Sequence, residues 1–231
     1  MVFPYVDFTS VLQDLRLLVF DFRKSVPGEE FYRISHTERV LHVQNLGKRF
    51  TGHWAFRHLS FSLQVGDALV VLGPNGSGKS TLLKTIAALT APSEGQVTLP
   101  DGDSRTILGL CALDQNVYSH LTVAEHLELA ANLRGITPEQ NLLTIVGLQD
   151  RKDQLATELS SGMRARLKLA LAIQSQPQLL LLDEPGAGLD ETGRALLDEI
   201  CEQQRQRGCL IVATNDPSER RLGTLELELA S

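Results

Sequence analysis

The sequence has few cysteines, and they are not arranged in a way that would organise a fold. Its three cysteines, Cys111, Cys201 and Cys209, include no C-x-x-C pair, and their odd number leaves one unpaired. We therefore expect neither a disulfide framework nor a zinc site, which fits a reducing cytosol. With 42% hydrophobic and 22% charged residues, the chain also lacks the compositional bias of disordered, collagen-like or disulfide-scaffold proteins.

Long apolar runs are also missing. No segment approaches the roughly 18 to 20 apolar residues that a membrane-spanning helix needs, so we expect a chain that does not span a bilayer. The most apolar early stretch, residues 11–22, contains Asp14, Arg16 and Asp21 and follows no basic leader, unlike a secretory signal peptide. The helical spacing of its apolar residues predicts an amphipathic helix. Four alternatives stay open for this segment: it packs on the body of the protein, belongs to a poorly ordered extension, docks a partner, or precedes the true start of translation.

Positive charge is in deficit. The net charge of −6 argues against non-specific binding to nucleic acid or to an anionic lipid surface as the main activity of the chain.

A length of 231 residues predicts one compact domain with a subdomain or an extension. Because the sequence changes in character near Val40, we predict an N-terminal extension of unknown function at 1–38 and a single domain at 39–231.

The strand patterns predict an α/β fold. Segments 40–46 and 59–65 are typical of an antiparallel, half-solvated pair, with Leu59, Phe61, Leu63 and Val65 on one face. Continuous apolar runs, which indicate strands buried on both faces, occur at 68–72, 179–182 and 210–213. Shorter β-type segments are found at 96–99 and 106–113, and a closing edge strand at 225–229.

Helical patterns separate these strands. Helices are predicted at 79–89 and 191–207, and leucine and alanine spacing is helical from 122 to 176, with breaks near 135–138, 147–153 and 159–162. The alternation implies a mostly parallel sheet with helices on both faces. We therefore predict an N-terminal antiparallel β subdomain, a parallel core and an inserted α-helical subdomain at about 116–176.

A glycine-rich loop follows the predicted strand at 68–72. It satisfies the phosphate-loop pattern G-x-x-x-x-G-K-[ST], with residues Gly73, Pro74, Asn75, Gly76, Ser77, Gly78, Lys79, Ser80 and Thr81. Such glycines let successive backbone N–H groups surround phosphate oxygens at a helix N-terminus; Lys79 neutralises the phosphates, and Ser80 offers an oxygen to Mg²⁺. A chance glycine-rich turn is the alternative, but this loop follows a buried strand and opens a helix, as a nucleotide site requires.

Two carboxylates end the predicted strand at 179–182. Asp183 and Glu184 fall at the C-terminal edge of the sheet, where open α/β sheets bind ligands. Asp183 is expected to hold Mg²⁺, and Glu184 to orient and deprotonate an attacking water. A solvated acidic turn is the better reading of such a pair alone; beside a phosphate loop, the pair favours nucleotide hydrolysis.

With these two motifs in this order, residues 40–229 resemble the ATP-binding cassette (ABC) family. Phe50 matches the aromatic residue on which that family stacks adenine, although an ordinary core Phe is the alternative and His53 and Trp54 lie nearby. Gln115 matches the glutamine that reaches Mg²⁺ and the attacking water, a match that rests on its position in the series. The resemblance thus implies a P-loop NTPase core.

The resemblance extends to the elements that act across a dimer, with departures. Residues 159–163 look like the family signature LSGGQ, but Ser161 and Met163 replace a glycine and the glutamine. Ser160, Ser161 and Gly162 still offer donors to a γ-phosphate, whereas a plain helix N-cap is the alternative. Asp190 matches the residue that contacts the opposite subunit.

The last element departs most from the family pattern. Asn215 stands where the family has its switch histidine, which contacts the γ-phosphate. Asparagine can donate a hydrogen bond but cannot carry a positive charge. We therefore expect slow basal ATP hydrolysis.

The resemblance implies a Mg²⁺-dependent ATPase subunit that dimerises head to tail with a second ATP-binding subunit, in a homodimer or a heterodimer. As in that family, it is expected to lie on the cytoplasmic face of the membrane, bound to a multi-spanning permease, with no nucleic acid as partner. A non-transport ABC ATPase and a slow-hydrolysing regulatory module are the alternatives. The short form is similar to ATPase subunits of exporters, including the haem-export type; substrate and direction are not specified.

Overall fold

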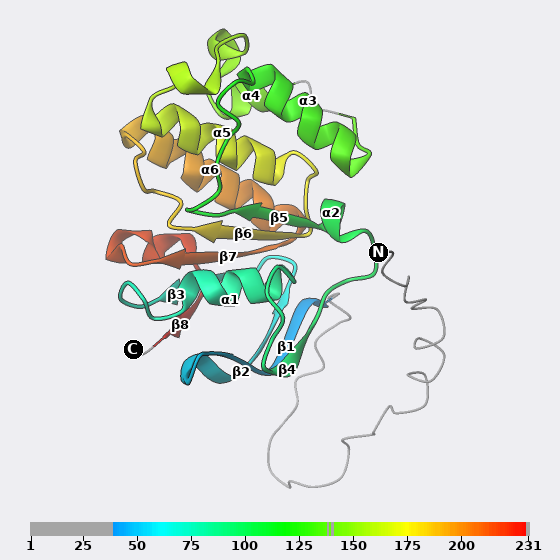
Figure 1. Cartoon of the computed structure of the whole chain (residues 1–231), viewed down its shortest axis with the longest axis vertical. Helices are drawn as coiled ribbons and strands as arrows, with labels where there is room; N and C mark the ends of the chain where they lie inside the picture. The colour runs from blue at the N-terminus through cyan, green and yellow to red at the C-terminus, as the bar shows by residue number, and fades with distance from the viewer. Residues whose placement is uncertain (1–38, 138, 140, 230–231) are drawn as a thin grey trace, which may run out of the picture. The chain divides into compact units, whose positions relative to one another are not determined.

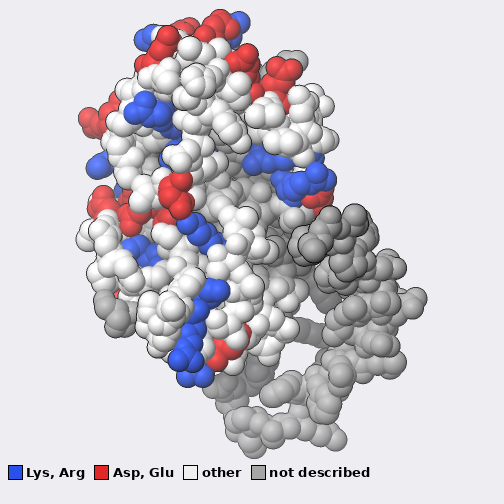
Figure 2. Space-filling model, in the orientation of Figure 1, with Lys and Arg blue, Asp and Glu red and all other residues white. Residues whose placement is uncertain are grey.

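The computed structural model describes residues 39–137, 139 and 141–229. The predicted extension at 1–38, with its helix at 11–22, lies outside the described residues. In the described part of the chain, no helix is long and apolar enough to cross a membrane. Basic and acidic side chains are interspersed over much of the face shown in Figure 2.

A five-stranded parallel sheet forms the centre of the described domain (Figure 1). Its order is β5-β6-β7-β3-β8, and each neighbouring pair runs parallel. The strands are β3 (Ala68–Leu72), β5 (Leu108–Cys111), β6 (Leu179–Asp183), β7 (Cys209–Thr214) and β8 (Leu225–Glu228). The three predicted buried strands and the predicted edge strand are confirmed, and the carboxyl ends of β3, β6 and β7 meet at one edge.

The N-terminal strands form a separate antiparallel sheet of order β2-β1-β4. Its strands are β1 (Arg39–Phe50), β2 (His53–Gln64) and β4 (Glu94–Thr98). The predicted antiparallel pair is confirmed, but the inclusion of Val65 in the second strand is wrong, and this residue is 38% exposed. Strand β2 ends at Gln64, whose N–H donates to the Asp67 carboxylate at 2.9 Å, so the chain has already turned away at Val65.

Helices cover both faces of the parallel sheet (Figure 1). They are α1 (Lys79–Ile86), α2 (Ser104–Ile107), α3 (Val123–Arg134), α4 (Leu142–Ile145), α5 (Ser161–Ile173) and α6 (Glu191–Arg207), with 3-10 turns η2 (Gln149–Arg151), η3 (Ala156–Glu158) and η4 (Pro217–Leu222). Within β3, Val70 packs with residues of α3, α5 and α6, whereas Leu69 and Val71 pack with α1 and the antiparallel sheet. The alternation of side chains along one strand therefore builds two cores.

The segment 106–113, which the pattern predicts as a strand, is only partly one. Ser104–Ile107 form the short helix α2, and β5 begins at Leu108. Asp103 caps this helix, because its carboxylate accepts from the Arg105 N–H at 2.9 Å. The cap stabilises a helical turn that the β-type pattern does not indicate.

The cysteines behave as ordinary core residues. Cys111, Cys201 and Cys209 are buried and free, so no disulfide joins them. Burial raises the pKa of each thiol to about 12. The thiols therefore stay protonated at neutral pH, and a protonated thiol is a poor nucleophile.

Candidate functional site

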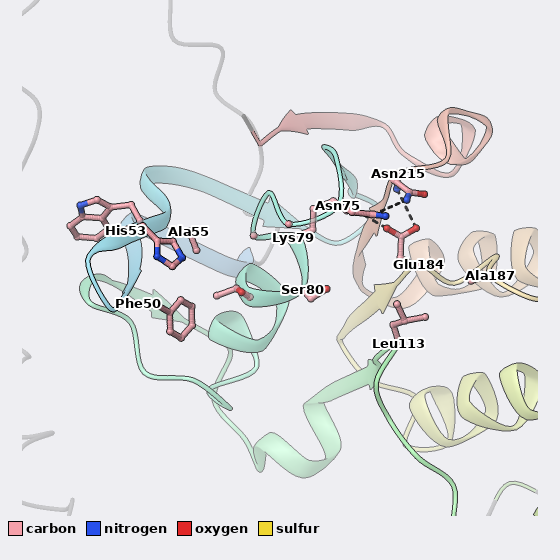
Figure 3. A pocket seen from close by; sticks show the side chains of 14 residues that line it. Phe50, His53, Ala55, Asn75, Lys79, Ser80, Leu113, Glu184, Ala187 and Asn215 are labelled. Carbon is pink, nitrogen blue, oxygen red and sulfur yellow. Dashed lines mark hydrogen bonds and ion pairs between the residues drawn. The ribbon is translucent and has the colours of Figure 1, made fainter. Parts of the chain in front are cut away.

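A cleft of about 530 Å³ opens at the carboxyl edge of the parallel sheet, beside the antiparallel sheet (Figure 3). It is lined by Phe50, His53, Trp54, Ala55, Asn75, Gly76, Gly78, Lys79, Ser80, Thr81, Leu113, Glu184, Ala187 and Asn215. These residues come from the end of β1, the start of β2, the glycine-rich loop, and the segments that follow β5, β6 and β7. One cleft thus joins the predicted adenine side to the predicted phosphate side.

The glycine-rich loop depends on Gly78, which precedes the first residue of α1. Its φ of 95° lies in the left-handed region that side chains rarely adopt. A Cβ at this position would also lie 2.7 Å from the Ala55 carbonyl oxygen of β2. Only glycine lets the loop turn into the helix while packing against β2, and this turn sets the N-terminus of α1 beside the cleft.

Lys79 is buried at the base of the loop, with 6% of its surface exposed. Its Nζ donates to the Gly73 carbonyl at 2.8 Å and to the Pro74 carbonyl at 3.1 Å. The same atom lies 3.6 Å from Oε1 of Glu184. The loop therefore holds a buried ammonium group between its own carbonyls and an acidic side chain, where it is able to meet an anion.

Glu184 follows the last residue of β6 in a strained conformation, with a φ of 49°. Its N–H donates to the Ala213 carbonyl of β7 at 2.8 Å. Its Oε2 accepts from the Asn215 N–H at 3.2 Å and lies 3.4 Å from the Thr214 hydroxyl (Figure 3). These contacts from β7 and the residue after it aim the carboxylate into the cleft.

Asp183 is the residue whose surroundings fit a magnesium ion. It is 4% exposed, and its Oδ1 is buried without a hydrogen-bond partner among the described residues. Ser80 lines the neighbouring cleft. Mg²⁺ is usually held by one or two protein oxygens, several waters and substrate phosphates, so this small donor set suits it when a nucleotide is bound.

Asn215 bridges the two halves of the phosphate side. Its side-chain Nδ2 donates to Oδ1 of Asn75 at 2.8 Å, while its backbone N–H donates to Glu184. Figure 3 shows the three side chains converging at one end of the cleft. The residue at the predicted switch position therefore contacts both the loop and the predicted base.

Two aromatic side chains flank the opposite end of the cleft. Phe50 is 40% exposed, with Lys48 Nζ 4.9 Å from its ring centre. Trp54 lies under the Arg57 guanidinium, at 4.3 Å from its ring centre. Either ring is able to stack on a flat base, so Phe50 shares this end of the cleft with His53 and Trp54.

The structure does not bring Gln115 to this cleft. Its Oε1 accepts from the Ala112 N–H at 3.4 Å, and the residue lines a separate groove of about 630 Å³ that also includes Arg105 and Arg134. The predicted contact of Gln115 with metal and water therefore requires a movement of this side chain.

The signature residues also lie away from the cleft. Ser160 caps α5, its hydroxyl accepting from the Met163 N–H at 3.2 Å, and both Ser160 and Ser161 are exposed. A Cβ at Gly162 would lie 3.0 Å from the Gly188 carbonyl oxygen, so the signature packs against the segment that leads to Asp190. The exposed N-terminus of α5 is free to meet a ligand held by another molecule.

Asp190 is engaged within its own chain. Its Oδ1 accepts from the Gly193 N–H at 2.8 Å, which caps α6, and from Arg166 of α5 at 2.6 Å. These two contacts hold the pKa of its carboxyl below the ordinary value, the Gly193 hydrogen bond being the larger cause. Asp190 thus links the signature helix α5 to α6.

Two residues near the site carry no signal in the sequence. Thr214 is the last residue of β7, and its hydroxyl lies beside Glu184. Glu219, in η4, is buried with 5% exposure in a segment whose sequence, Pro-Ser-Glu-Arg-Arg, is typical of a solvated turn. Only the fold shows that these two residues are close to the segment that holds Glu184.

The sequence model of a protein family described as "ABC transporter" matches residues 56–187, more than half of the chain. The chain belongs to the ABC transporter family. The matched region contains the phosphate loop, Gln115, the signature segment and the two carboxylates Asp183 and Glu184.

Curated relatives of this ABC family member include longer proteins. It is 33% identical over 196 residues to "ATP-binding cassette sub-family A member 9" from Mus musculus, covering 77% of this chain and 12% of the relative. It is 34% identical over 195 residues to "Methionine import ATP-binding protein MetN 1" from Burkholderia lata, covering 75% of this chain and 57% of the relative. The chain therefore spans about an eighth and somewhat more than half of these two relatives.

A solved ABC structure shares the fold. It is a dimeric ATP-binding cassette in a post-hydrolysis state, bound to ADP and Pi, with a TM-score of 0.74 and 22% identity. The match covers 82% of this chain and 94% of the other. The predicted fold class, a P-loop core with an antiparallel subdomain and a helical insertion, is therefore confirmed for this ABC protein.

Proposed function

We propose that this chain is the ATP-binding and ATP-hydrolysing module of an ABC transporter, formed by the domain at 39–231. The observation that carries the proposal is the buried Lys79 ammonium, held by two phosphate-loop carbonyls and 3.6 Å from Glu184. A buried cation facing a carboxylate at a helix N-terminus is suited to an anionic ligand and to hydrolysis beside it. The extension at 1–38 has no assigned role.

The residues at the cleft have separate roles in phosphoryl transfer from ATP to water. The phosphate-loop N–H groups and Lys79 hold and neutralise the phosphates, and Glu184 orients the water and accepts its proton. Asp183 and Ser80 would hold Mg²⁺, which supplies charge neutralisation at the phosphates. The aromatic end, with Phe50, would hold the base.

Hydrolysis on this account needs a second ATP-binding subunit. The signature residues Ser160, Ser161 and Gly162 do not line the cleft of their own chain, yet two of them are exposed. A head-to-tail dimer, homomeric or heteromeric, would place them on the nucleotide held by the partner. Asp190 lies next to this surface, through its contact with α5.

The dimer would drive a multi-spanning permease and would lie on the cytoplasmic face of the membrane through that partner. Names of relatives in this family mention methionine import and phospholipid transport, which are different substrates. On this proposal the permease selects the substrate. The haem-export subtype remains a prediction.

A second candidate function is a module that closes on ATP and hydrolyses it slowly. Asn215 favours it, because this side chain is hydrogen-bonded to Asn75 and carries no charge. The experiment is to titrate the purified chain with Mg·ATP, following the fluorescence of Trp54, its only tryptophan, and then to measure phosphate release. Quenching with turnover supports the ATPase, and quenching without turnover supports the slow module. The absence of both quenching and turnover would contradict both candidate functions.

Co-purification with a membrane protein separates a transporter subunit from a non-transport ABC ATPase.

A further inference from the structure

Glu219 is a buried acidic residue that the proposed chemistry does not use. It is 5% exposed, and its Oε2 has no hydrogen-bond partner among the described residues. Burial raises the pKa of its carboxyl, and the negative charges of Asp216 and Glu184 add to the rise. Burying a carboxyl group costs free energy unless neighbouring groups hydrogen-bond to it.

The basic residues that follow Glu219 do not neutralise it. Arg220 makes ion pairs with Glu226 and Glu228 of β8, at 3.9 and 3.3 Å. Arg221 pairs with Asp198 of α6 at 2.7 Å. Both guanidinium groups thus anchor the outside of η4, and the Glu219 side chain alone of these three residues enters the interior.

The carboxyl group of Glu219 lies against Gly186, two residues after Glu184. A Cβ at Gly186 would overlap Oε1 of Glu219 and lie 3.3 Å from its Cδ. The φ of Gly186 is not in the left-handed region, so an added methyl group would meet the end of the Glu219 side chain and no backbone strain. The Gly186 N–H offsets part of the rise that burial causes in the pKa of the Glu219 carboxyl.

The same carboxyl group lies close to Thr214, which also contacts Glu184. The Thr214 hydroxyl lies 3.4 Å from Oε2 of Glu184, accepts from the Asp216 N–H at 2.9 Å, and lies close enough to Glu219 to affect its pKa. Glu219 therefore lies against the turn that follows Glu184 and close to the end of β7, the two segments that hold Glu184. These are the contacts that set a residue whose φ is 49°.

We propose that Glu219 is a positioning residue, which fixes Gly186 and Thr214 so that the Glu184 carboxylate stays aimed at the phosphate side of the cleft. The inference rests on the proposed ATPase activity. Glu219 itself does not line the cleft, so it acts through the residues it touches and not on the substrate. Its loss should therefore reduce kcat and leave the binding of ATP unchanged.

The test compares Glu219→Leu, which removes the polar contacts, with Glu219→Gln, which keeps the shape and a carbonyl oxygen. Glu226→Leu is the matched control, because Glu226 is an exposed glutamate of the same region. Gly186→Ala is a second route, since its methyl group would displace the carboxyl while Glu219 remains. Four quantities are measured: kcat for ATP, KM for ATP, Trp54 quenching by ATP, and amide hydrogen exchange in the segment 184–189.

We expect Glu219→Leu and Gly186→Ala to lower kcat by about tenfold to a hundredfold, because a misplacement of about 1 Å can cost that much. KM and the midpoint of Trp54 quenching should change less than about twofold, exchange at 184–189 should accelerate, and Glu219→Gln should restore most of kcat. Wild-type kcat in either disruptive variant, or equal loss of kcat in Glu219→Gln and Glu219→Leu, would overturn the inference.

The hydrogen-exchange arm separates this inference from the proposed function. If the wild-type chain hydrolyses no ATP, the proposed function fails, and exchange at 184–189 still decides whether Glu219 fixes this segment. Unchanged exchange in both Glu219→Leu and Gly186→Ala would overturn the positioning role, whatever the ATPase assay shows.

Discussion

Asn215 donates a hydrogen bond from its side-chain Nδ2 to Oδ1 of Asn75 at 2.8 Å, which joins the end of β7 to the phosphate loop. Its backbone N–H donates to Glu184 at the same time. One residue therefore couples the loop that would hold ATP to the carboxylate that would activate water. Its side chain is neutral, so it adds no positive charge to the γ-phosphate position.

This relationship predicts that Asn215→His raises turnover. A histidine at this position can donate to the γ-phosphate and carry a charge, so we expect steady-state phosphate release to rise about tenfold or more. Asn215→Ala, which removes the bond to Asn75 without adding a donor, is the control and should not exceed the wild-type rate. Little or no rise with histidine would count against Asn215 as the limiting residue.

Lys79→Ala should abolish productive ATP binding. The substitution removes the buried ammonium group that faces the phosphate side of the cleft, and among the described residues no other lysine or arginine lines that cleft. Titration with Mg·ATP should then give no Trp54 quenching at concentrations that saturate the wild type. Lys84→Ala, which removes a half-buried lysine outside the cleft that pairs with Asp114 at 2.6 Å, should leave quenching intact. Equal quenching in all three proteins would exclude Lys79 as the phosphate-binding residue.

The phosphate loop could be predicted from the sequence because its chemistry lies in nine consecutive residues, Gly73 to Thr81, between a strand and a helix. The contact between Asn75 and Asn215 joins residues 140 positions apart and depends on the pairing of β3 with β7. The burial of Glu219 likewise follows from packing against Gly186, which no local pattern encodes.

The errors in the predicted secondary structure have a local origin. Residues 106 and 107 follow a β-type pattern, but the cap at Asp103 draws them into α2. Val65 continues the alternation of β2, yet the turn held by Asp67 takes it out of the strand. In both places one side-chain hydrogen bond to the backbone outweighs the local pattern.

Gly109→Ala should destabilise the domain. A Cβ on this residue of β5 would overlap the Ala172 carbonyl oxygen of α5 and lie 2.8 Å from the Pro177 ring. We expect the free energy of unfolding to fall by about 1–3 kcal/mol, as overpacked sites do. Urea unfolding measures this change, and an unchanged midpoint would show that β5 and α5 have room to separate.

Asp190→Asn should reduce stability at neutral pH more than at acid pH. The Gly193 N–H and Arg166 hold the pKa of Asp190 below its ordinary value. Its stabilising contribution is therefore present above the ordinary pKa of about 4 and is lost as the pH falls through the lower folded-state value. Unfolding midpoints of wild type and variant should converge as the pH drops below about 4. A constant difference across this range would contradict the assignment.

The central claim, ATP hydrolysis with Glu184 as the base, is tested most directly by Glu184→Gln. Its phosphate release from Mg·ATP is measured beside the wild type, together with Trp54 quenching and dimer content. We predict wild-type ATP binding, turnover lower by about a hundredfold or more, and a closed dimer that accumulates with ATP. Undiminished turnover by the Gln variant would contradict the account.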